Sequence, residues 1–156
     1  MANSIYLAAP FFSETQIERV KEVQSLLKQN STVDSDNIFV PMEHQMESEE
    51  FGSFPWQVGV FESDVRQVRT ADAVVAILDY EKNGDEILSD SGTIFEVGMA
   101  YEHGVPVILV QFDKAGKMNL MLARSYAACF SGDDVKKLAS YNFDELPTVF
   151  SKLEVF

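Results

Sequence analysis

One glutamate of this sequence sits in a setting typical of acids that do chemistry. Glu96 lies within residues 91–100, SGTIFEVGMA, a predicted helix start whose other side chains are nearly all small or apolar. A carboxylate held there loses hydration, so either its pKa rises or hydrogen bonds keep it ionised, and both outcomes are common in catalytic acids. The spacing from Thr93 to Glu96 also fits a capping box, in which Glu96 reaches back to the first amide of the helix. Residue types and spacing favour neither interpretation over the other.

Most of the other acidic residues have a simpler explanation. Residues 43–50 hold four glutamates and residues 79–90 hold five Asp or Glu, so nine of the 25 acids occupy 20 positions that follow predicted strands. Such runs are usually solvated loops. We therefore expect about three acids to act in a site and the rest to form a solvated surface.

Several other chemistries lack support in the sequence. The motifs GxGxxG, GxxxxGK[ST] and GxSxG do not occur, so neither a dinucleotide or triphosphate site nor a Ser-His-Asp hydrolase is indicated. One cysteine, Cys129, and two histidines cannot assemble a Cys/His zinc site. Carboxylates also suit Mg²⁺, which stays open as an alternative, but we expect neither a metal nor a cofactor.

Length and charge set the class of protein and of partner. The chain has 156 residues, of which 46% are hydrophobic, enough for a single domain spanning residues 1–156. Its net charge of −13 repels phosphate backbones and anionic lipids, which makes nucleic-acid polymers and membranes poor partners. The unpaired Cys129, the lack of a signal-peptide pattern and the lack of a long apolar run predict a cytoplasmic protein.

Strand-like and helix-like segments alternate along the chain. Such alternation predicts an α/β fold, namely a single-domain, doubly wound, flavodoxin- or Rossmann-like sheet of five mostly parallel strands with helices on both faces. Ligands of such sheets bind outside the carboxyl ends of the strands, here in the loops after residues 9, 40, 78 and 110. Strands are predicted at residues 5–9, 37–40, 73–78, 105–110 and 127–130, and helices at residues 14–28, 56–69, 93–103 and 133–140.

The helix start around Glu96 also carries a family resemblance. From Asp90 to Ala100 the sequence is similar to the nucleophile motif of the nucleoside 2-deoxyribosyltransferases, an acidic residue and a small turn followed by Glu-x-Gly-x-Ala. Similarity continues in the same order along most of the chain. It covers residues 6–12, 40–45, 56–64 and 117–121.

The resemblance implies roles for residues at the centre of a site. Glu96 matches the nucleophile, and Tyr6 matches an aromatic hydroxyl that orients it. Phe12 matches an aromatic side chain that packs near the nucleobase. Gln45 and Asp64 match polar groups around the base or the nucleophile, and Asp64 is our candidate proton donor to the leaving base.

The resemblance also implies a sugar contact and a shared site. Asp90 matches a carboxylate that binds the sugar 5′-hydroxyl. Asn119 and Met121 match residues that a neighbouring subunit lends to the site, and the terminal carboxylate, here on Phe156, reaches a site in some members. We therefore expect a homo-oligomer, by family analogy a hexamer of three dimers.

The same residues have ordinary structural explanations. Tyr6 and Phe12 fit core aromatics, Gln45 fits a loop-capping amide and Asn119 fits a helix N-cap. Asp64 fits a solvent-facing position in the middle of a helix. Without the resemblance these explanations are the better ones.

The resemblance implies transfer of the 2-deoxyribosyl group of a 2′-deoxyribonucleoside to another purine or pyrimidine base. The implied route is a ping-pong double displacement through a covalent intermediate on Glu96, with retention at C1′. The implied setting is nucleotide salvage. Partners are then small-molecule deoxynucleosides and free nucleobases. One alternative is an N-glycosidase of deoxynucleoside 5′-monophosphates on the same fold, although Asp90 would repel a 5′-phosphate. The other is a non-catalytic, small-ligand-binding flavodoxin-like module.

Overall fold

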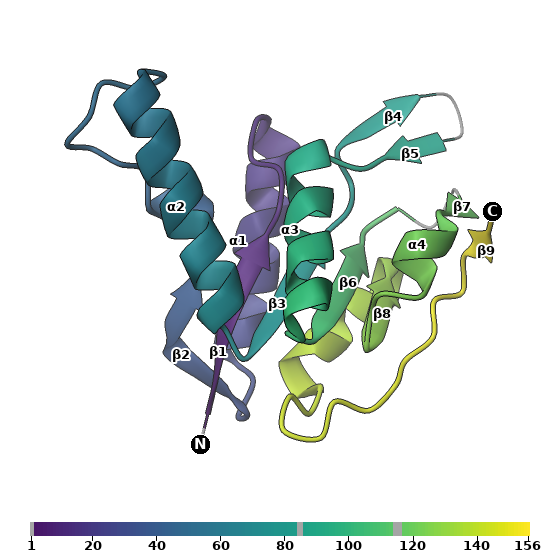
Figure 1. The fold of residues 1–156 in the computed structure, drawn as a ribbon. Helices are drawn as coiled ribbons and strands as arrows, with labels where there is room; N and C mark the ends of the chain where they lie inside the picture. The colour runs from purple at the N-terminus through teal and green to yellow at the C-terminus, as the bar shows by residue number, and fades with distance from the viewer. Residues whose placement is uncertain (1, 84–85, 114–116) are drawn as a thin grey trace.

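The central feature of the fold is a parallel sheet whose chain order reverses in the middle. The computed structural model describes residues 2–83, 86–113 and 117–156, and within them five parallel strands pair in the order β2-β1-β3-β6-β8 (Figure 1). From β1 the chain moves to one edge, and from β3 it moves to the other. This confirms the predicted doubly wound sheet. The strands are β1 (Asn3–Ala8), β2 (Val33–Phe39), β3 (Ala73–Ile77), β6 (Val107–Gln111) and β8 (Ala128–Ser131).

Helices cover both faces of the sheet. Helix α1 (Glu14–Lys28) and the 3₁₀ helix η2 (Gly132–Ser140) pack on one face, while α2 (Phe54–Thr70) and α3 (Ser91–His103) lie side by side on the other (Figure 1). Successive side chains of β1 point to opposite faces, as the pleat of a strand requires. Leu7 joins the core under α1, whereas Tyr6 joins the core under α2 and α3.

The long helices begin at polar caps that the sequence supplies. Ser13 caps α1 and forms a capping box with Gln16, and Ser53 caps α2. Helix α3 begins after Asp90 and ends at Gly104, whose φ of 80° is the left-handed conformation that glycine adopts without strain. These caps hold the helix starts at the carboxyl edge of the sheet, where a site is expected.

Several elements differ from the predicted ones. Strand β2 begins at Val33 because it is an edge strand and tolerates exposed polar residues. The last helix is 3₁₀ rather than α, which matches the three-residue spacing of its buried Val135 and Leu138. The elements not predicted are η1 (Pro41–Glu43), β4 (Glu81–Asn83), β5 (Glu86–Leu88), β7 (Lys117–Met118), α4 (Leu120–Ala123) and β9 (Glu154–Val155).

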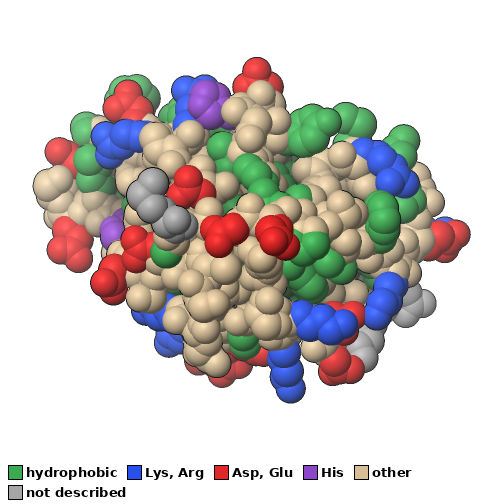
Figure 2. Space-filling view, turned by 90° about the horizontal axis from the view of Figure 1, so that it is seen from below, with side chains coloured by type: hydrophobic (Ala, Val, Ile, Leu, Met, Phe, Trp, Pro, Cys, Tyr) green, Lys and Arg blue, Asp and Glu red, His purple; other side chains and the backbone are tan. Residues whose placement is uncertain are grey.

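Charged side chains are interspersed on the surface. Seen from below, the molecule presents acidic and basic side chains scattered among hydrophobic side chains and the tan of the backbone and other side chains (Figure 2). None of the helices built from the described residues is long and apolar enough to cross a membrane.

Candidate active site

A short hydrogen bond joins the central strand β1 to helix α3. The hydroxyl of Tyr6 donates to Glu96 Oε1 across 2.5 Å, and Tyr6 itself is fully buried. Burial, followed by the charges of Glu96 and Asp64, raises the pKa of Tyr6 well above its ordinary value. The hydroxyl therefore keeps its proton and acts as a donor at every physiological pH. This geometry orients one oxygen of Glu96 and leaves the other available.

Two carboxyl groups of the site have raised pKa values. Loss of hydration raises the pKa of Glu96 from 4.5 to about 7, the bond from Tyr6 opposes the rise, and the charges of Asp64 and Asp90 add to it. Loss of hydration also raises the pKa of Asp64, on α2, from 3.8 to about 6. Asp64 is thus partly buried, not simply solvent-facing as its position in a helix suggested. Acids of this kind exchange protons near neutral pH.

The start of α3 decides between the two interpretations of Glu96. Asp90 is the N-cap, and its Oδ2 accepts hydrogen bonds from Thr93 N at 2.8 Å and Thr93 Oγ1 at 3.0 Å. The capping box from Thr93 to Glu96 is therefore wrong, because the helix begins three residues earlier and Glu96 bonds Tyr6 instead. The carboxylate of Glu96 therefore does not cap the helix.

An aromatic stack supports Tyr6 from the β2 side. The ring of Phe39 stacks on Tyr6 with centroids 5.6 Å apart, and the ring of His44 stacks on Phe39 at 4.3 Å. Gln45 follows directly, and its Nε2 donates to Pro41 O at 2.9 Å. Gln45 thus caps its own loop, as its ordinary explanation predicted. Phe39 was missed because its apolar strand position has no chemical signal.

Phe12 lies on the surface and not in the core. Its ring is 69% exposed and meets the ring of Tyr80 edge to face, with centroids 6.2 Å apart. Buried Gln16 holds both loops, since it accepts from Phe12 N and donates to Tyr80 O. Sequence reasoning missed Tyr80 and Gln16. The available signal was a glutamine on the otherwise apolar face of a helix.

Asp79, placed by sequence among solvated loop acids, is buried at 2% exposure. Its two oxygens accept from Phe112 N at 2.8 Å and Asp113 N at 2.9 Å, and the guanidinium of Arg19 lies 3.8 Å away. Burial raises the pKa of Asp79, and these amides and Arg19 oppose the rise. The carboxylate ties together the loops that follow β3 and β6.

Asn119, Met121 and Phe156 belong to a separate, exposed unit. Asn119 caps α4 by accepting from Met121 N at 2.9 Å, and Phe156 O accepts from Leu120 N at 3.1 Å. Met121 is 77% exposed and Phe156 is 67% exposed. Among the described residues, no hydrogen bond joins this unit to Tyr6 or Glu96.

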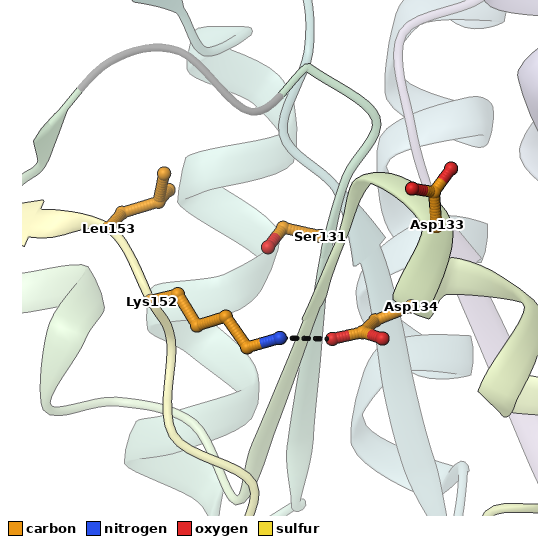
Figure 3. Close-up of a pocket in the computed structure, with 5 residues that line it drawn as sticks. All are labelled: Ser131, Asp133, Asp134, Lys152 and Leu153. Carbon is orange, nitrogen blue, oxygen red and sulfur yellow. Dashed lines mark hydrogen bonds and ion pairs between the residues drawn. The ribbon is translucent and has the colours of Figure 1, made fainter.

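A hollow at the end of β8 does not coincide with these groups. It has a volume of about 280 Å³ and is crossed by an ion pair of 2.7 Å between Lys152 Nζ and Asp134 Oδ2 (Figure 3). The bonds from Lys152 and Lys137 lower the pKa of Asp134 to about 2. Within the described part of the chain, no cluster of three His, Cys, Asp or Glu is arranged to hold a metal ion. The lining residues are Ser131, Asp133, Asp134, Lys152 and Leu153.

Comparison with known proteins supports a common family. A nucleoside deoxyribosyltransferase from Limosilactobacillus fermentum is 32% identical, and the match covers 97% of this chain and 94% of that protein. A nucleoside deoxyribosyltransferase from Lactobacillus leichmannii is 26% identical, and the match covers 91% of this chain and 90% of that protein. The solved structure of a 2-deoxyribosyltransferase from Bacillus psychrosaccharolyticus is 34% identical and superposes with a TM-score of 0.81, covering 95% of this chain and 98% of that one. A conserved protein from Enterococcus faecalis shares the fold, with a TM-score of 0.57. It is 20% identical, and the match covers 94% of this chain and 96% of that one.

The family model described as nucleoside 2-deoxyribosyltransferase matches residues 5–133. That span includes the hydrogen-bonded pair Tyr6 and Glu96 and the start of α3. The chain is therefore an enzyme of the nucleoside 2-deoxyribosyltransferase family.

Proposed function

We propose that this enzyme transfers the 2-deoxyribosyl group between nucleobases through a covalent ester on Glu96. The observation that carries the proposal is the 2.5 Å bond from Tyr6 to Glu96 Oε1, because it fixes a partly buried carboxylate in one orientation at the carboxyl edge of the sheet. An oriented carboxylate with reduced hydration is a better nucleophile than a solvated one. Membership of the family indicates the transfer reaction, and the fixed orientation of Glu96 supports a double displacement at this residue.

In the first half-reaction Glu96 attacks C1′ of a bound deoxynucleoside. A bond forms between C1′ and the carboxylate oxygen that Tyr6 does not hold, while the bond from C1′ to the base nitrogen breaks and its electron pair leaves with the base. Positive charge develops on the sugar in the transition state, and the carboxylate stabilises it. A second base then attacks C1′ and releases Glu96. Two inversions give net retention, and a 2′-hydroxyl would crowd the approach of the carboxylate.

Asp64 is the proposed source of the proton that the leaving base requires. With pKa values of about 6 and about 7, Asp64 and Glu96 together hold one proton between those pH values. Because the pKa of Glu96 is the higher of the two, the proton lies more often on Glu96, and the reactive form, with the proton on Asp64 and the negative charge on Glu96, is the less populated one. Asp64 gives that proton to the departing base and recovers a proton from the incoming base in the second half-reaction.

The remaining groups suit an uncharged nucleoside. We assign the second oxygen of Asp90 to accept a hydrogen bond from the sugar 5′-hydroxyl, since Oδ2 already binds Thr93. A 5′-phosphate would meet this carboxylate and be repelled. Phe12 and Gln45 are assigned to the base. These assignments favour free deoxynucleosides and bases over nucleotides.

We also infer that neighbouring subunits complete the site. Asn119, Met121 and Phe156 are exposed and joined in one unit, which leaves their side chains accessible to another subunit. The expected assembly is a hexamer of three dimers. Light scattering on the purified protein measures this, and a monomer with full activity would contradict it.

The proposed setting is nucleotide salvage in the cytoplasm. The sole cysteine of the sequence, Cys129, is buried, and burial raises its pKa to about 11. Such a thiol is unreactive, and an unpaired cysteine of this kind is compatible with a reducing compartment. Localising the tagged protein in its host cell tests this setting.

The deciding experiment is base exchange between deoxyinosine and adenine. Glu96→Ala is expected to abolish exchange, while Glu102→Ala, an exposed glutamate of the same helix, is the matched control and retains it. Wild-type protein quenched with donor alone should gain the mass of one deoxyribosyl group on Glu96. Exchange by the Glu96→Ala variant would refute the assignment, and release of base from thymidylate without exchange would indicate a nucleotide glycosidase.

A further inference from the structure

The rings of Phe12 and Tyr80 meet across the switch point of the sheet. Phe12 follows β1 and Tyr80 follows β3, and these adjacent central strands are the ones between which the chain order reverses. Doubly wound sheets bind their ligands in the crevice outside this point. The edge-to-face contact at 6.2 Å therefore lies where a ligand of the fold is expected, with most of the Phe12 ring open to solvent.

One buried side chain holds both loops that carry this contact. Gln16 Oε1 accepts from Phe12 N at 2.7 Å and from Ser13 N at 3.1 Å, and Gln16 Nε2 donates to Tyr80 O at 3.0 Å. Because the oxygen faces two donors and the nitrogen faces an acceptor, the opposite orientation of the amide does not fit. Gln16 thus fixes the loop after β1 against the loop after β3.

We propose that Gln16 is a positioning residue that sets the base-binding side of the site by tying Phe12 to Tyr80. The inference rests on the proposed function, because it places the nucleobase against Phe12. Without the hydrogen bonds of Gln16, the exposed Phe12 ring samples more conformations. Binding of a base then has to restrict the ring to one of them, which costs conformational entropy. That ordering cost falls on binding and not on the chemical step at Glu96.

The substitution Gln16→Glu separates the tie from the helix cap. A carboxylate still accepts from Phe12 N and Ser13 N, and a negative charge is favourable in the first turn of a helix. The carboxylate cannot donate to Tyr80 O, so one of its oxygens faces this carbonyl oxygen and the two acceptors repel each other. The matched control is Ser13→Ala, which removes the hydroxyl that accepts from Gln16 N at 3.3 Å and leaves the tie to Tyr80 in place.

The test is steady-state exchange kinetics on the full-length protein, with thermal unfolding measured for every variant. Gln16→Glu is expected to raise KM for donor and acceptor about five- to tenfold with kcat within about twofold of wild type. Ser13→Ala is expected to unfold at lower temperature with KM within about twofold of wild type. In a Phe12→Ala background, Gln16→Glu should raise KM by less than about twofold, because the group through which it acts is gone.

An unchanged KM in Gln16→Glu would overturn the inference, and so would a rise that is equally large with and without Phe12. A fall in kcat that follows the loss of stability in both Gln16→Glu and Ser13→Ala would assign Gln16 a purely structural role. Absence of exchange in the wild-type protein would overturn the proposed function and this inference together. Exchange in wild type with an unchanged KM in the variant overturns the inference alone.

Discussion

Replacing Tyr6 by phenylalanine tests the hydrogen bond at the centre of the site. Tyr6 is fully buried and its ring stacks on Phe39, so the substitution keeps the packing and removes only the hydroxyl that lies 2.5 Å from Glu96 Oε1. The variant is expected to fold. Any change in activity then reports on the hydroxyl.

The expected magnitude follows from the energy of a hydrogen bond to a charged group, about 1.5–3 kcal/mol. The bond favours the ionised form of Glu96 and so lowers its pKa. Its loss raises the pKa of Glu96 by about one to two pH units, since one unit corresponds to about 1.4 kcal/mol. Glu96 then ionises well above its present value of about 7.

This rise has two consequences for the rate. In the variant, the single proton that Glu96 and Asp64 share lies more often on Glu96, where it blocks attack. The maximum of kcat/KM is therefore expected to fall about tenfold to a hundredfold. The basic limb of the pH profile moves to higher pH, because the pair holds its last proton more tightly.

The assay is exchange between deoxyinosine and adenine from pH 5 to pH 9.5. The matched control is Tyr141→Phe, which removes a buried hydroxyl that donates to Pro147 O at 3.1 Å on the other face of the sheet. It is expected to leave the pH profile in place. A Tyr6→Phe profile with an unchanged maximum, or with its basic limb moved to lower pH, would refute the reasoning.

Two further predictions concern recognition and stability. Asp90→Asn keeps a good N-cap and weakens acceptance of the 5′-hydroxyl, so KM for deoxyinosine should rise about tenfold while KM for 2′,5′-dideoxyinosine stays the same; an equal rise for both would contradict this. Asn30→Ala should lower the free energy of unfolding by about 2–4 kcal/mol in urea titrations. The reason is that buried Asn30 donates to Leu138 O and Tyr141 O and accepts from Thr32 N and Thr32 Oγ1, and all four hydrogen bonds are lost. A loss below about 1 kcal/mol would show that water replaces it.

Periodicity was enough to predict the sheet but not the start of helix α3. The apolar runs over β3 and β6 are long and uninterrupted, and such runs are typical of central parallel strands. Asp90 and Thr93 are both good caps, three residues apart, and local sequence does not choose between them. In the structure Asp90 is the cap, and Glu96 instead bonds Tyr6, which is ninety positions away. A contact of that separation leaves no periodic signal.

The positioning residues were hidden for a related reason. Asp79 stands in an acidic stretch that composition assigns to solvent, yet it binds two amides that come 33 and 34 positions later in the chain. Gln16 is polar on an apolar helix face, and a search for hydrophobic periodicity discards such a residue. In both cases the partner is a backbone group, which has the same chemistry in every sequence. Only the folded arrangement of the strand ends reveals the pairing.

The hydrophobic pattern of β1 also determines where the candidate nucleophile is held. Ile5 and Leu7 fill the core under α1, which turns Tyr6 toward α3. A shift of β1 by one residue would exchange the faces of all its side chains and carry the hydroxyl away from Glu96. The apolar residues on the α1 face therefore fix the register that places Tyr6 opposite Glu96. Gln16 is also buried on α1 and ties the loops that carry Phe12 and Tyr80. The positions of the nucleophile and of the proposed base-binding side therefore both depend on packing beneath α1.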